Sequence, residues 1–102
     1  MYKIRVSDNA RKDMEKMVDY ISSELNNPAA AYDLLAEIEK RFELILNNPH
    51  MYQLCEGLKD KKNIYRKFCV NNYVIIYTVE EPEHVIRFHR LFYGRQDYIN
   101  LI

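Results

Sequence analysis

The 102-residue sequence contains only two glycines, three prolines and two cysteines, and it has no tryptophan. So little glycine and proline excludes a collagen-like or low-complexity chain, and two cysteines exclude a disulfide-rich miniprotein. No apolar run approaches the roughly 18 residues of a membrane span. The first residues also lack the apolar stretch of a secretion signal. We therefore expect a cytoplasmic protein that does not associate with a membrane.

Metal-binding and cofactor-binding patterns are also missing. Cys55 and Cys69 are too far apart for a C-x-x-C motif, and His50, His84 and His89 are not grouped with carboxylates at metal-ligand spacing. The two glycines form no phosphate-binding loop. The sequence predicts no metal and no cofactor.

Composition and charge describe an ordinary globular protein. Apolar residues make up 48% and charged residues 29% of the chain, and its length suits a single domain over residues 1–102. The net charge is zero, but residues 1–58 carry 7 basic against 10 acidic side chains (−3), and residues 59–102 carry 8 against 5 (+3). This asymmetry indicates a basic face for an anionic partner, with ordinary solvated charge as the alternative.

Hydrophobic spacing predicts one strand followed by two helices. Residues 2–6 alternate as in a strand, and Ser7 or Asp8 can cap a helix whose apolar residues recur every three or four positions to Leu25. Asn27 and Pro28 are suited to begin a second helix, which the Asn-Asn-Pro segment at 47–49 ends. The short connection between them predicts an antiparallel helical hairpin.

Three β-prone segments follow, at 64–70, 73–79 and 85–93, after a predicted loop over 50–63. Asn71-Asn72 suits a two-residue hairpin turn because asparagine tolerates positive φ. The predicted fold is α+β in the order β-α-α-β-β-β, with the helical hairpin packed on a four-stranded, mainly antiparallel sheet.

The two-residue turn also fixes a register. Val70 opposes Tyr73, and in this register the more apolar face of the two strands lies toward the helices. On the last strand, alternation places Ile86, Phe88 and Phe92 toward the helices. The opposite face then carries Lys67, Arg87, His89, Leu91 and Tyr93. A one-residue slip or a bulge would invert this assignment.

This opposite face mixes cationic, titratable and apolar groups, and no further helix is available to cover it. We hypothesise that it binds another protein chain or a nucleic acid. The alternative is a solvated face whose few apolar residues need no explanation.

Five segments carry a resemblance to a known family. They are VSDNARKDM (6–14), LILNNP (44–49), YRKF (65–68), YVIIY (73–77) and RLFYGRQD (90–97). In this order and spacing the chain resembles the RelE/ParE superfamily of toxins from bacterial type II toxin–antitoxin systems. The resemblance implies a growth-inhibiting toxin that a cognate antitoxin neutralises.

The superfamily implies two mechanisms. RelE-like members cleave mRNA, usually on the ribosome, and ParE-like members poison DNA gyrase. The two long helices and the neutral charge resemble the ParE-like branch. RelE-like nucleases are strongly basic and have an arginine where this chain has Val74. We therefore favour gyrase inhibition, with mRNA cleavage as the alternative and an antitoxin-binding module without toxicity as the third possibility.

Candidate site residues follow from these mechanisms. Metal-independent RNA cleavage requires a base, an acid and cations for the developing phosphorane charge, and the candidates for those roles are His89, Tyr93, Lys67 and Arg87. Candidate phosphate contacts are Arg66, Arg90 and Arg95, although the register leaves an ion pair with a helix carboxylate open for Arg66. Candidate antitoxin contacts, chosen as apolar residues, are Ile76, Leu91, Tyr98 and Leu101.

Overall fold

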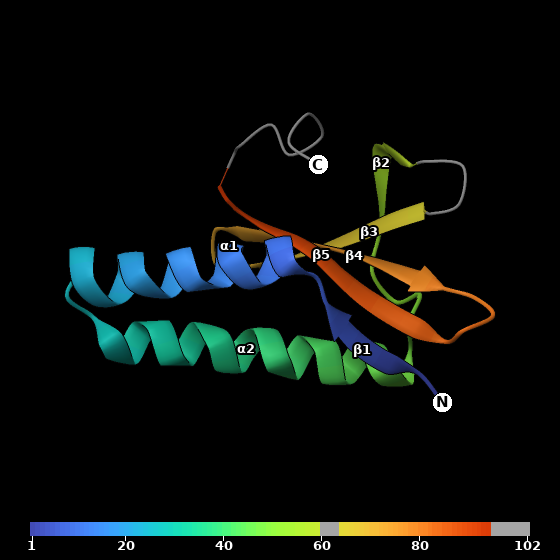
Figure 1. The fold of residues 1–102 in the computed structure, drawn as a ribbon, viewed down its shortest axis with the longest axis horizontal. Helices are drawn as coiled ribbons and strands as arrows, with labels where there is room; N and C mark the ends of the chain where they lie inside the picture. Colours follow the sequence, from blue (N-terminus) through green and yellow to red (C-terminus); the bar gives the residue numbers. More distant parts are fainter. Residues whose placement is uncertain (60–63, 95–102) are drawn as a thin grey trace.

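The computed structural model describes residues 1–59 and 64–94, which form two layers, a helical hairpin and a sheet (Figure 1). Along the chain the elements are β1 (Lys3–Val6), α1 (Asp8–Asp19), the π-helix η1 (Tyr20–Glu24), α2 (Pro28–Asn47), β2 (Leu54–Lys59), β3 (Ile64–Val70), β4 (Tyr73–Glu80) and β5 (Val85–Tyr93). The predicted α+β fold with an antiparallel helical hairpin is confirmed.

Side-chain caps begin both helices of the hairpin. The Ser7 hydroxyl accepts a hydrogen bond from the Ala10 N–H at 3.0 Å, and the Asn27 side chain accepts from the Ala30 N–H at 3.1 Å. These bonds satisfy backbone donors that have no partner inside a helix, and Pro28 stands where a missing N–H is tolerated. The predicted starts of both helices are confirmed.

The main core lies between the helices and one face of the sheet. Phe42 of α2 lies at its centre, with ring centroids 5.5 Å from Phe68 and 5.1 Å from Phe88. The buried residues around it come from every helix and from three strands; they include Ala10, Met17, Ile21, Leu34, Ile38, Ile45, Ile75, Tyr77 and Ile86. This packing fixes the helices on one face of the sheet. We call the opposite side the bare face.

The strand order is β1-β5-β4-β3-β2, with β1 parallel to β5 and the other neighbours antiparallel. Val70 pairs with Tyr73 across a turn in which Asn71 has φ of 53°. The predicted register of β3 against β4 is therefore confirmed.

The prediction of a four-stranded sheet and of a loop over 50–63 is wrong for β2. Within the described residues the sheet has five strands, because 54–59 pairs with the outer edge of β3. Glu56 and Gly57 give this segment low strand propensity, so its pairing depends on the open edge that β3 offers. Residues 60–63 of the predicted loop lie outside the described residues.

The predicted phase of β5 is correct through His89 and wrong beyond it. Phe88 pairs with Tyr77, but Arg90 pairs with the preceding residue, Ile76, so His89 is the extra residue of a β-bulge. The bulge exchanges the faces of the residues that follow. Leu91 therefore joins the core beneath the helices, and Phe92 lies on the bare face.

The bare face has a small apolar cluster of its own. Five buried side chains pack together there: Cys55, Tyr65, Val74, Ile76 and Phe92. Much of the apolar content that suggested an exposed binding face is therefore already buried.

Candidate functional site

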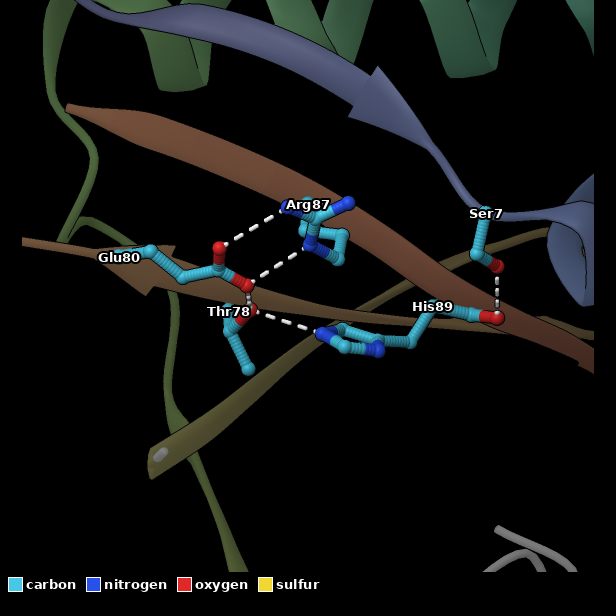
Figure 2. Close-up of polar contacts among 5 residues, drawn as sticks. All are labelled: Ser7, Thr78, Glu80, Arg87 and His89. Atoms are coloured by element: carbon cyan, nitrogen blue, oxygen red, sulfur yellow. Dashed lines mark hydrogen bonds and ion pairs between the residues drawn. The ribbon is translucent and has the colours of Figure 1, made fainter. Parts of the chain in front are cut away.

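A row of polar side chains crosses the bare face from β4 to β5 (Figure 2). Arg87 lies opposite Thr78 in the ladder and is bound at two points to Glu80, with Nε 2.9 Å from Oε2 and Nη2 3.1 Å from Oε1. These donors stabilise the ionised carboxylate, so Arg87 holds the pKa of Glu80 below its ordinary value. The negative charge of the Glu80 carboxylate thereby compensates the positive charge of the Arg87 guanidinium.

Thr78 connects this ion pair to His89. Its fully buried hydroxyl donates to Glu80 Oε2 at 3.1 Å and lies 2.8 Å from Nε2 of His89. A hydroxyl has one proton, so the remaining bond is donated by Nε2–H and accepted by Thr78. The Tyr65 ring meets the imidazole edge-on, with centroids 5.2 Å apart. Together these contacts orient the His89 ring.

The backbone of His89 is held from the other side. The Ser7 hydroxyl donates to the His89 carbonyl at 2.8 Å, as Figure 2 shows at the junction of β1 and α1. The bulge that positions the imidazole is thereby tied to the start of the first helix.

The structure brings together three of the four predicted catalytic residues. Lys67, Arg87 and His89 lie on the bare face. The placement of Tyr93 on that face is wrong because of the bulge. Tyr93 pairs with Tyr73, their rings are 5.1 Å apart, and both line a groove beside α1.

The predicted phosphate-binding arginines have different surroundings. Arg90 forms an ion pair with Asp13 of α1 at 2.7 Å. Arg66 donates to the carbonyl oxygens of Tyr52 and His50, at 2.7 and 3.3 Å, so the predicted helix carboxylate is replaced by backbone acceptors. Arg95 lies outside the described residues.

The apolar residues expected to contact the antitoxin are not at the surface where the structure describes them. Ile76 is fully buried in the bare-face cluster, and Leu91 is buried beneath the helices. The expectation that they are exposed is wrong, because it overlooked both that cluster and the bulge. Tyr98 and Leu101 lie outside the described residues.

Thr78 and Glu80 are site residues that sequence reasoning missed. Both alternate in phase with Lys67, which places them on the bare face, but no motif marks them as functional. Among the described residues no group of three His, Cys, Asp or Glu side chains could hold a metal ion. No helix in the described part of the chain is long and apolar enough to cross a membrane.

Solved structures share this arrangement of helices and strands. A chain of the RelE–RelB complex from Pyrococcus horikoshii OT3 is similar with a TM-score of 0.58 and 15% identity, over 93% of this chain and 97% of that one. The isolated E. coli RelE toxin is similar with a TM-score of 0.59 and 14% identity, over 99% of this chain and 93% of that one. A chain of the intact E. coli RelBE toxin–antitoxin complex is similar with a TM-score of 0.55 and 15% identity, over 94% of this chain and 100% of that one. No curated protein matches the sequence.

The helical hairpin on a mixed five-stranded sheet is thus the fold of the RelE/ParE toxins. A family model described as the ParE toxin of the type II toxin–antitoxin system parDE matches residues 4–98. The chain belongs to this family, which confirms the superfamily inferred from its motifs. It is the toxin of a type II toxin–antitoxin system, and its partner is the cognate antitoxin that neutralises it.

Proposed function

We propose that this toxin stops growth by inhibiting DNA gyrase and that it does not cleave RNA. The observation that carries the proposal is the two-point bond between Arg87 and Glu80 beside His89. Stabilising a phosphorane requires cationic charge directed at its oxygens. In this chain an ionised carboxylate already compensates that guanidinium and would repel a phosphate.

Three further observations support the proposal. Asp13 compensates Arg90 in the same way. Tyr93 lies on the helix side of the sheet, so it is separated from His89 by the strand itself. The chain is also electrically neutral overall, whereas binding to ribosomal RNA favours a strongly basic protein.

Two assays with the purified toxin test the proposal. We expect it to inhibit gyrase supercoiling in a dose-dependent manner and to leave mRNA intact, both with and without ribosomes. His89→Ala should still inhibit gyrase, with its unfolding midpoint measured to confirm that it folds. Supercoiling that stays unaffected by the wild type would contradict the proposal.

Ribonuclease activity is the second candidate, because Thr78 orients the His89 imidazole and Lys67 lies on the same face. If the toxin is a ribonuclease, it cleaves mRNA, and His89→Ala and Lys67→Ala each abolish the cleavage. Cleavage that survives both substitutions would point to a contaminating nuclease.

For the antitoxin, we propose that the C-terminal residues Tyr98 and Leu101 contribute contacts. A partner that binds only the native toxin raises its Tm by mass action. We expect Tyr98→Ala with Leu101→Ala to reduce that rise at a fixed antitoxin concentration. An equal rise for the variant would remove these residues from the interface.

A further inference from the structure

The far end of the helical hairpin extends beyond the sheet (Figure 1). We call residues 17–36 the hairpin tip; they comprise the end of α1, all of η1, the connection and the first half of α2. Met17, Ile21 and Leu34 are buried within the tip, and Met17 and Tyr20 also line the groove that includes Tyr73 and Tyr93 of the sheet.

Three large apolar side chains at the tip remain in solvent. Tyr20 is 51% exposed, Leu25 is 55% exposed and Tyr32 is 73% exposed. They come from η1, from the connection and from the first turns of α2. Exposed tyrosine is common in the energetic centres of protein interfaces, because it adds large contact area with few rotatable bonds.

The charge of the tip has one sign. Residues 17–36 contain three carboxylates and neither lysine nor arginine. Asp19, Glu24 and Asp33 are all exposed, and no ion pair among the described residues involves any of them. Within residues 17–36 the exposed apolar side chains are therefore accompanied by negative charge alone, with Lys16 directly before the tip as the nearest cation in the sequence. This excess of negative charge favours a positively charged partner surface and repels nucleic acid.

We propose that the hairpin tip is the surface by which the toxin docks on gyrase, and that it binds a basic surface of that enzyme. The inference rests on the proposed function. Gyrase acts on DNA, and a protein that holds DNA carries lysine and arginine on its surface. Tyr20, Leu25 and Tyr32 supply the buried contact area, and the three carboxylates supply the electrostatic match.

Matched pairs of substitutions on α2 test the docking surface. Asp33→Lys reverses a charge at the tip, and Glu43→Lys makes the same change on exposed α2 outside the tip. Tyr32→Ala removes an exposed apolar side chain at the tip, and Leu44→Ala, at a residue 46% exposed, is its control. All four positions are exposed, so unfolding midpoints should stay close to that of the wild type.

We expect each tip variant to raise the toxin concentration for half-inhibition of supercoiling at least about tenfold, and each control to change it less than about twofold. Inhibition by the wild type should weaken as salt rises, and Asp33→Lys should reduce this salt dependence. If the wild type inhibits gyrase and the tip variants inhibit it equally well, the docking proposal is wrong and the proposed function stands. If the wild type does not inhibit gyrase, both are wrong.

Discussion

Asp13 of α1 and Arg90 of β5 form a two-bond ion pair directly after the bulge. Arg90 Nε donates to Oδ2 at 2.7 Å and Nη2 donates to Oδ1 at 3.2 Å. Asp13 Oδ2 also accepts the Leu91 N–H at 2.9 Å, so one carboxylate binds both the side chain and the backbone of the strand. The Asp13 side chain is only 11% exposed, which limits its access to water.

Replacing this carboxylate should destabilise the fold. Asp13→Ala removes the carboxylate to which the Arg90 guanidinium and the Leu91 N–H donate, and we expect it to lower the free energy of unfolding by about 2–4 kcal/mol. Urea denaturation measures the change. Asp8→Ala is the control, since the Asp8–Arg11 pair is exposed to solvent. If the two variants lost similar amounts of unfolding free energy, the ion pair between α1 and β5 would not stabilise the fold.

Ser7 should be more important than an ordinary helix cap. Its hydroxyl accepts from Ala10 N–H and donates to the His89 carbonyl, so both of its hydrogen-bonding capacities are used. We expect Ser7→Ala to cost about 1–2 kcal/mol in unfolding free energy, and Ser7→Thr, which retains the hydroxyl, to recover most of it. No recovery with threonine would indicate that the side-chain volume matters instead.

Tyr77 should make the fold sensitive to alkaline pH. Burial raises the pKa of its phenol from 10.0 to about 12, and its hydroxyl donates to the Pro49 carbonyl at 3.2 Å. Between these two values the native chain keeps a proton that the unfolded chain releases, so stability should fall as pH rises above 10.0.

Urea denaturation across this alkaline range measures the effect, and Tyr77→Phe should flatten part of the fall. At neutral pH the same substitution should cost about 1 kcal/mol, because the Pro49 carbonyl loses its donor. Tyr32→Phe, at an exposed position, serves as the control. An unchanged alkaline slope in Tyr77→Phe would contradict the assignment.

Glu80 should make the fold sensitive to acid. The Arg87 bonds hold the pKa of Glu80 below 4.5, so its stabilising contribution is present above that value and is lost as pH falls through the folded-state pKa. We expect Glu80→Gln to be less stable than the wild type at neutral pH and to lose less stability on acidification to about pH 3. If the unfolding free energies of the two proteins fell equally with decreasing pH, the Arg87–Glu80 pair would not be the source of the acid sensitivity.

The sequence was most informative where a turn fixed the pairing. Asn71-Asn72 suits a two-residue turn, so the pairing of β3 with β4 could be counted outward from it. That pairing determines on which face of the sheet each side chain lies. The helix starts were equally accessible, because Ser7 and Asn27 are residues whose side chains accept the first free N–H groups.

The sequence did not reveal β2 or the bulge, for different reasons. The pairing of β2 depends on the neighbouring edge of β3 rather than on its own composition. No glycine or proline marks the bulge at His89, which is stabilised by Ser7 and Thr78 from other parts of the chain. The candidate site was therefore predicted in part, with Lys67, Arg87 and His89 placed on the correct face and Tyr93 on the wrong one.

The bulge has a consequence for how this toxin tolerates insertions and deletions. Because His89 is the extra residue, removing it would leave Phe88 opposite Tyr77 and Arg90 opposite Ile76, so Leu91 and Phe92 would stay in their two apolar clusters. The deletion would instead remove the carbonyl that accepts from Ser7 and the imidazole that contacts Thr78. The extra residue therefore serves the polar row on the bare face and not the pairing of the strand.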